Sequence, residues 1–440
     1  MKVEVVVISN EIIKPSSPTP DHFRRYQLSF LDQLSAKIYN PFVLFYEIED
    51  HYGSKVNEIS NKIKNSLSEV LTLYYPLAGR VKNDRFVDCN DDGVFFSVAR
   101  VKSPCHLSQA IKDPLPSELD NFLPFKINEL TEFAIDVQLN VFESGGIALG
   151  LCTSHQIVDA LSSIMFIKTW VAIARGEADH ISHPEFVSAK LFPPLDDPKF
   201  DSAIPPKVIS KRFVFEGSTI EAIRSNYEKK TCLEGDRRPS RVEALSAFIW
   251  SRFVVATSYN DENSDKTEKV YVVTHVVNLR PKLDPPLPQQ SLFGNIYRYM
   301  YAYFPSTILS SYEKDDYGYV AMKEIRAGLE KMDMDYLRKV QEGDDVKTKL
   351  FNKYKEELSM KGGELISFGF TSLCRFPLYD ADFGWGKPTW VSATSLVYEN
   401  LVAFMDTKTG NGIEAYVSMK EENMAKLADD TEFLKAVSQL

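Results

Sequence analysis

Hydrophobic and polar residues alternate over several short stretches in the first half of the chain, as they do in half-buried strands. Such alternation runs through 79–101 and 132–142, while 3–9, 41–47 and 147–153 are more continuously apolar. Short apolar runs of this length are typical of buried strands rather than helices. The first half of the chain is therefore predicted to form a sheet, in which the strands with continuous apolar runs are largely buried.

Helical spacing replaces this alternation in two places. Apolar residues recur every three or four positions over 56–71 and again over 161–172, which predicts two amphipathic helices. His155 falls between the apolar run 147–153 and the second of these helices. A side chain at such a strand-to-helix junction often faces a cleft. An imidazole with its ordinary pKa of about 6.5 can also accept a proton at neutral pH.

The pattern begins again after a proline-rich stretch, 193–208, which we interpret as a linker. Strands are expected at 210–215, 270–279, 364–376, 400–406 and 413–418, and helices at 217–229, 240–257, 318–342, 345–360 and the C-terminus. Each half thus mixes strands and helices in a similar order. The sequence predicts an α/β protein with two related domains, 1–192 and 209–440, and a cleft between them.

The composition narrows the class of protein. The 440 residues are 44% hydrophobic and carry a formal net charge of −10. Nucleic acid is not expected as a partner, because such binding needs a basic face. We expect neither a signal peptide nor a membrane span, since no apolar run is long enough. Five scattered cysteines suit a reducing compartment, so we expect a cytoplasmic protein without a metal site.

Two short motifs stand out, although each is weak when taken alone. His155 is followed four residues later by Asp159, and such a pair also occurs where a buried histidine only bonds the backbone. Near the C-terminus, Asp382-Phe-Gly-Trp-Gly386 places two glycines around a tryptophan. Taken alone, that sequence is better explained by an ordinary tight turn with a buried tryptophan.

Together, the two motifs resemble the double signature of the BAHD family of plant acyl-CoA-dependent acyltransferases. Further landmarks of the family match at 75–80, 277–281 and 293–295, so the resemblance covers the whole chain. The segments 13–18, 31–34 and 88–93 are most similar to the subgroup that acetylates alkaloid alcohols. The resemblance implies a monomer of two similar chloramphenicol-acetyltransferase-like domains, each with a mixed sheet flanked by helices. It also implies a channel between them and a C-terminal segment, near 380–408, that joins the first domain.

The resemblance further implies roles for individual residues. His155 would be the general base of the catalytic pair, and Asp159 would form a salt bridge with Arg280. Supporting roles away from the reacting atoms would fall to Asp382, Gly384, Trp385 and Gly386. The co-substrate would be an acyl-CoA, expected to be acetyl-CoA, with no bound cofactor, and the acceptor a small-molecule alcohol. Leu373 stands where many members have tryptophan, which reshapes the acceptor pocket.

Other candidates come from the residues themselves. Ser240, Arg241 and Ser246 lie at or near the start of a predicted helix, where amide donors suit the CoA phosphates. Thr371 is a candidate donor to the negative charge that develops on the thioester oxygen. Cys152 is expected to pack in its strand, so we predict direct transfer without an acyl-enzyme.

Two alternative functions remain open from the sequence. The same base would serve an N-acyltransferase that acts on an amine. A non-catalytic binding protein could also keep this fold. Turnover of acetyl-CoA with alcohol and amine acceptors would separate these possibilities.

Overall fold

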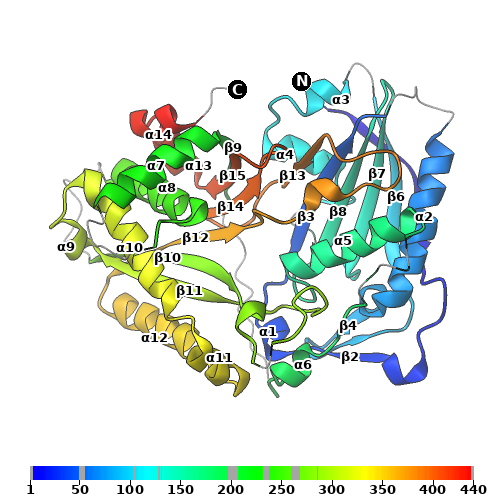
Figure 1. Ribbon diagram of the computed structural model, residues 1–440, viewed down its shortest axis with the longest axis horizontal. Helices are drawn as coiled ribbons and strands as arrows, with labels where there is room; N and C mark the ends of the chain where they lie inside the picture. The colour runs from blue at the N-terminus through cyan, green and yellow to red at the C-terminus, as the bar shows by residue number, and fades with distance from the viewer. Residues whose placement is uncertain are drawn as a thin grey trace.

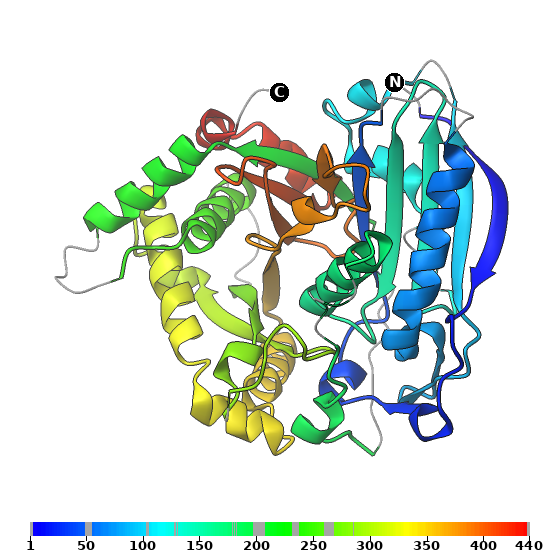
Figure 2. The same ribbon diagram turned by 45° about the vertical axis from the view of Figure 1, so that its right-hand side comes forward.

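The computed structural model describes residues 3–48, 55–102, 105–126, 129, 131–177, 179, 181, 183–196, 207–230, 237–258, 268–284 and 286–437. These residues form two six-stranded sheets and a small three-stranded sheet. The two large sheets belong to two lobes that stand side by side in Figures 1 and 2, with helices beside each sheet. The predicted α/β fold of two domains with mixed sheets is therefore confirmed. No helix among the described residues is long and apolar enough to span a bilayer.

The first sheet has the strand order β1-β6-β7-β8-β3-β13, and all neighbours are antiparallel except β6 and β7. Its strands are β1 (Val5–Ile13), β6 (Val94–Val101), β7 (Ile135–Phe142), β8 (Ile147–Ser154), β3 (Tyr39–Tyr46) and β13 (Trp390–Ser392). The small sheet contains β2 (Arg25–Gln27), β5 (Phe86–Asp88) and β4 (Arg80–Lys82). The helices of the first half of the chain are α1 (Phe30–Gln33), α2 (Val56–Leu73), α3 (Leu107–Ala110), α4 (Pro116–Leu119), α5 (Ala160–Ala174) and α6 (Ser188–Leu191). Of these, α1 and α6 pack apolar side chains against the core of the second lobe.

The helices α2 and α5 pack against each other beside the first sheet (Figures 1 and 2). Ile63, Leu67 and Val70 form the fully buried stripe of α2, as the helical spacing of the sequence requires. Strand β8 is instead buried on both faces as far as Thr153, which explains its continuous apolar run. One hydrophobic core forms where these elements meet.

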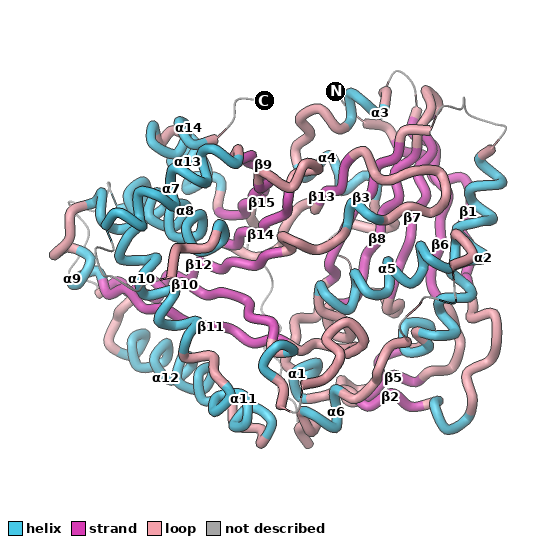
Figure 3. Tube along the Cα trace, in the orientation of Figure 1, coloured by secondary structure: helices cyan, strands magenta, loops and turns pink. Residues whose placement is uncertain are grey.

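The second sheet has the order β11-β10-β12-β14-β15-β9, and its central strands β10, β12 and β14 are parallel. The strands are β9 (Ile209–Phe215), β10 (Lys269–Asn278), β11 (Tyr297–Pro305), β12 (Glu364–Ser372), β14 (Leu401–Asp406) and β15 (Ile413–Met419). The helices are α7 (Gly217–Lys230), α8 (Arg241–Ser258), α9 (Ser306–Leu309), α10 (Tyr317–Glu330), α11 (Met334–Gln341), α12 (Val346–Met360), α13 (Glu421–Ala428) and α14 (Thr431–Ala436). Figure 3 shows the strands of both lobes in magenta and the helices in cyan.

A segment from the C-terminal half crosses between the lobes. After β12 the chain leaves the second sheet, and Trp390 of β13 pairs with Phe45 of β3 in the first sheet. The chain then returns to the second sheet at Leu401 in β14. Residues 197–206 of the expected linker lie outside the described residues, and the domain boundaries themselves stay a prediction.

Two expectations about the second half were incomplete. Strand β11 was not predicted, although only one of its faces is fully buried: Tyr299, Tyr301 and Tyr303 on the other face are partly buried or exposed. Because tyrosine is itself a large aromatic residue, the stretch does not show a clear alternation of polar and apolar residues. The helix expected over 318–342 is wrong as one element: α10 ends at Glu330, and α11 begins again at Met334. Asp333 caps the second helix by accepting a hydrogen bond from the backbone N–H of Tyr336, at 2.9 Å.

Candidate active site

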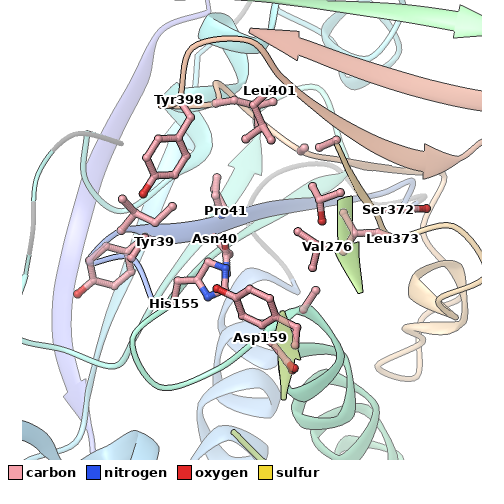
Figure 4. A pocket seen from close by; sticks show the side chains of 18 of the residues that line it. Tyr39, Asn40, Pro41, His155, Asp159, Val276, Ser372, Leu373, Tyr398 and Leu401 are labelled. Carbon is pink, nitrogen blue, oxygen red and sulfur yellow. The ribbon is translucent and has the colours of Figure 1, made fainter. Parts of the chain in front are cut away.

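A cavity of about 260 Å³ lies between the two lobes, and both of them contribute to its wall. His155 and Tyr39 come from the first lobe, while Val276 and Thr371 come from strands of the second. Figure 4 shows the His155 imidazole with Tyr39 and Tyr398 on one side and Val276 on the other. The histidine singled out by the sequence therefore faces a cavity formed by both lobes.

His155 is held at the end of β8 by its own backbone. Its N–H donates to the carbonyl of Ile38 at 2.8 Å, which extends the pairing between β8 and β3 by one residue. The chain then turns, and Asp159 caps α5 by accepting a hydrogen bond from the Ser162 N–H at 2.9 Å. The strand end and the helix cap together fix the short loop that carries the imidazole.

The protonation of the His155 ring follows from its neighbour Asn295. The Asn295 side-chain NH₂ donates to the His155 carbonyl at 2.9 Å, which turns the amide oxygen towards the ring. That oxygen lies 3.1 Å from Nδ1 and can only accept a hydrogen bond, so Nδ1 carries the proton. The other ring nitrogen, Nε2, is then left with a free lone pair, as a general base requires.

Burial sets the charge of this ring. It lowers the pKa of His155 below the ordinary value of 6.5, although the nearby Asp159 carboxylate opposes the change. A lowered pKa means that the neutral, basic form predominates at neutral pH. The base is thus ready before any substrate binds.

We expect kcat/KM for acetyl-CoA to be level at neutral pH and to fall only in acid below pH 6.5, as His155 becomes protonated. The rates would be measured in overlapping buffers from about pH 5 to about pH 9, with checks of folding at each pH. A half-maximal rate above pH 7 would contradict this assignment of the base.

Asp159 forms a buried ion pair that joins the two lobes. Its two oxygens lie 2.6 Å and 3.1 Å from the two terminal nitrogens of Arg280. Both residues are almost fully buried, with 6% and 1% of their surface exposed. Burial alone would raise the pKa of Asp159, but the Arg280 guanidinium holds it below its ordinary value. The carboxylate is therefore ionised, and it ties the His155 loop to the second lobe.

Arg280 is enclosed by the segment that also supplies Asn295. Its guanidinium donates to the carbonyls of Leu292 and Gly294, at 3.0–3.1 Å. Gly294 has a φ of +119°, a backbone conformation that side chains disfavour. A Cβ at this position would also lie 3.0 Å from Ser188. The glycine thus permits the turn that places Asn295 against His155.

The Asp382–Gly386 loop lies at the other end of α5. Asp382 accepts the backbone N–H groups of Gly384 and Gly386 at 2.7 Å and 2.9 Å, which closes the loop. Its carbonyl accepts a hydrogen bond from Arg175, directly after the end of α5, whereas His155 precedes the start of this helix. A helix of 15 residues is about 22 Å long. The loop is therefore remote from the imidazole.

Aromatic packing attaches the same loop to the first lobe. Phe383 lies edge to face with Trp170 of α5 at 5.0 Å and stacks on Trp385 at 5.5 Å. The Tyr46 hydroxyl of β3 donates to the Ala381 carbonyl at 2.7 Å. These contacts hold the segment just before β13, where it joins the first sheet. A structural role in the interlobe crossing accounts for the motif. The support of CoA binding that the family resemblance also implies for this loop stays a prediction.

The predicted CoA and oxyanion candidates are not gathered at one point. Thr371 lines the cavity with His155. Ser240 bonds Glu243 in a capping box at the start of α8, and Arg241 pairs with Asp406 at 2.7 Å. Ser246 is fully buried and does not line the cavity, so it cannot meet a phosphate there. Among the described residues, no group of three His, Cys, Asp or Glu side chains could hold a metal ion.

Several residues in or behind the cavity wall were not singled out as site residues from the sequence. Asn295 was part of a family landmark without a role, and Tyr297, Tyr299 and Tyr398 were not considered. The Tyr297 ring lies 5.5 Å from that of His155. Tyrosines at alternate positions along one apolar stretch would have signalled a strand face, but β11 itself was not recognised.

Known proteins match this chain over nearly its whole length. The model of the Transferase family matches residues 1–434. Limonoid 1-O-acetyltransferase of Citrus sinensis is 35% identical over 453 residues, covering 99% of both chains. Stemmadenine O-acetyltransferase of Catharanthus roseus is 35% identical, covering 98% of this chain and 97% of that one. The crystal structure of vinorine synthase superposes with a TM-score of 0.82 at 35% identity, covering 99% of both chains.

Proposed function

The chain belongs to the BAHD family of acyl-CoA-dependent acyltransferases, and we propose that it moves an acetyl group from acetyl-CoA to a hydroxyl of a plant alkaloid or terpenoid. The observation that carries the proposal is the His155 ring, which offers an unprotonated Nε2 in a cavity shared by two lobes. The relatives named above are acetyltransferases of an alkaloid and of limonoids, which supports acetyl transfer to oxygen.

The proposed reaction needs one base and no covalent enzyme intermediate. Nε2 of His155 takes the proton of the acceptor hydroxyl as its oxygen attacks the thioester carbon. The carbonyl oxygen gains negative charge, for which Thr371 is a candidate donor. The carbon–sulfur bond then breaks, and the imidazolium returns the proton to the departing CoA sulfur. Holding both substrates in one cavity supplies the required orientation.

Cys152 supports direct transfer rather than a two-step route. Its side chain is fully buried, and burial raises the pKa of its thiol well above the ordinary value. A buried neutral thiol is a poor nucleophile. Accumulation of a radiolabelled acetyl-enzyme without an acceptor would contradict this route.

The cavity wall supports an acceptor with a large apolar skeleton. Phe42, Val276, Leu396 and Leu401 face the space together with several tyrosines. The charged residues of the wall, Asp159 and Arg280, already neutralise each other. An apolar wall with a few hydroxyl groups suits a neutral ring system better than an anion.

The decisive experiment offers labelled acetyl-CoA to the protein with a panel of alkaloid and terpenoid alcohols. Amines of matched size serve as the second panel. We expect acetate esters from one or more alcohols and slower transfer to the amines. Transfer to amines alone would replace the proposal with N-acylation, and no turnover with any acceptor would refute it.

One rim of the cavity carries positive charge suited to the CoA phosphates. Arg375 is exposed, and the residues 371–373 and 376 on either side of it line the cavity. Asp406 accepts the Arg375 backbone N–H at 2.5 Å, which fixes the chain at Arg375. The same carboxylate pairs with Arg241, so the positive charge at this rim is that of Arg375. We infer that CoA enters here.

Arg375→Ala should therefore raise KM for acetyl-CoA by about tenfold without lowering kcat, because one charge-assisted hydrogen bond is lost. Steady-state kinetics would measure both constants. S-acetyl-pantetheine, which lacks the nucleotide phosphates, is the matched control and should show the same KM with either protein. An equal loss with both donors would place Arg375 elsewhere.

A monomeric state and a cytoplasmic location remain predictions. Acetyl-CoA is proposed as a co-substrate that leaves after each turnover, with no resident cofactor.

A further inference from the structure

We propose that Asp32 is a positioning residue for the reaction: acting through Asn295, it determines which nitrogen of His155 carries the proton. This inference rests on the proposed function, in which Nε2 of His155 is the base. Asp32 does not line the cavity, so it would act without touching either substrate.

Asp32 lies in the short helix α1 and has no exposed surface. One of its oxygens, Oδ2, accepts the backbone N–H and the hydroxyl of Ser29, at 2.9 Å and 2.6 Å. The other, Oδ1, accepts the backbone N–H and the side-chain NH₂ of Asn295, at 2.7 Å and 3.0 Å. Burial raises the pKa of Asp32 to about 6, and the group is therefore mostly ionised at neutral pH. An ionised carboxylate only accepts hydrogen bonds.

Asn295 has a fixed orientation as a result. Its NH₂ has two acceptors, Oδ1 of Asp32 and the His155 carbonyl, while its oxygen faces Nδ1 of His155. Rotating the amide by half a turn would bring its oxygen against two other acceptors. The buried carboxylate makes that arrangement especially unfavourable, because a hydrogen bond to a charged group is the stronger one to lose.

The rotated amide would also reverse the chemistry of the histidine. Its NH₂ would then donate to Nδ1, and the ring proton would have to sit on Nε2. An imidazole with a proton on Nε2 has no lone pair to offer a hydroxyl in the cavity. The state of the base thus depends on a carboxylate two hydrogen bonds away from its ring.

The arrangement also joins the two lobes. His155 follows β8 of the first lobe, and Asn295 precedes β11 of the second. Asp32 lies in α1, whose Phe30 and Leu31 pack into the core of the second lobe. Asn295 is fully buried between them. The correct tautomer therefore requires that the lobes be assembled.

Asp32→Asn tests the inference because it removes the charge and keeps the shape. The new amide cannot accept from Ser29 and Asn295 at once, so the orientation of the Asn295 amide is held only by the His155 carbonyl and its preference is weakened. We expect kcat to fall by about tenfold to a hundredfold while KM for acetyl-CoA stays the same. The ring nitrogens of ¹⁵N-histidine-labelled protein would be examined by NMR, with His155→Gln used to assign the His155 signals. The wild type should show the proton on Nδ1, and Asp32→Asn should show a population with it on Nε2.

Asp345→Asn is the matched control for lost stability. Asp345 is also a buried carboxylate that caps a helix, α12, but its partner is Arg298 and it does not line the cavity. This variant should melt earlier, yet keep kcat per folded molecule and the Nδ1 proton. The inference is overturned if Asp32→Asn keeps the wild-type tautomer, or if it loses activity only in proportion to unfolding. If no acceptor turns over, the proposed function fails, and the tautomer measured by NMR still decides the role of Asp32.

Discussion

Replacing His155 with alanine should lower the rate of acetyl transfer by about 10²–10⁴-fold or more, the usual contribution of a general base. The affinity for acetyl-CoA should change little, because the substitution leaves the exposed Arg375 at the charged rim in place. Rates would be measured with saturating donor and an acceptor identified by the alcohol panel. Donor binding would be measured separately by calorimetry.

Two further variants make the result specific to the base. His155→Asn places an amide N–H near the position of Nδ1, where it can still donate to the Asn295 oxygen, but it cannot accept a proton, so it should be as inactive as the alanine variant. His275→Gln replaces another buried histidine, which does not line the cavity, and should retain activity. Substantial transfer by either His155 variant would mean that the acceptor is deprotonated by another group.

Replacing Asp159 with alanine should cost both stability and activity. The change leaves the Arg280 guanidinium buried without its partner, which destabilises a folded protein by about 3–5 kcal/mol. It also removes the cap of α5 and releases the loop that carries His155. Chemical denaturation would measure the free energy of unfolding, and initial rates at low temperature would measure the activity of the folded fraction.

Glu432→Ala is a useful comparison for this ion pair. Glu432 pairs with Lys435 at the surface, and both side chains are more than half exposed. Its removal should leave the free energy of unfolding nearly unchanged, since exposed pairs contribute little. If Asp159→Ala lost activity with unchanged stability, the carboxylate would have to orient the imidazole directly. The geometry argues against that role, because both oxygens already face Arg280.

The repeating pattern of apolar residues determined most of the individual elements. It placed α2, β8 and α5 within a few residues of their bounds. It also put His155 at the junction between a strand and a helix, because a strand buried on both faces leaves a short apolar run and a helix leaves a period of 3.6. Two motifs at a distance from each other were then enough to indicate the family.

Only the tertiary structure decided which side chains meet. Asn295 lies 140 residues from His155 in the chain, and Arg280 lies 121 residues from Asp159. No local period records such contacts, because they depend on how two separately formed sheets pack. The same packing separates the Asp382–Gly386 loop from the imidazole by the length of α5. The sequence identified a histidine that can act as a base, and the assembled lobes determined which of its nitrogens is free to do so.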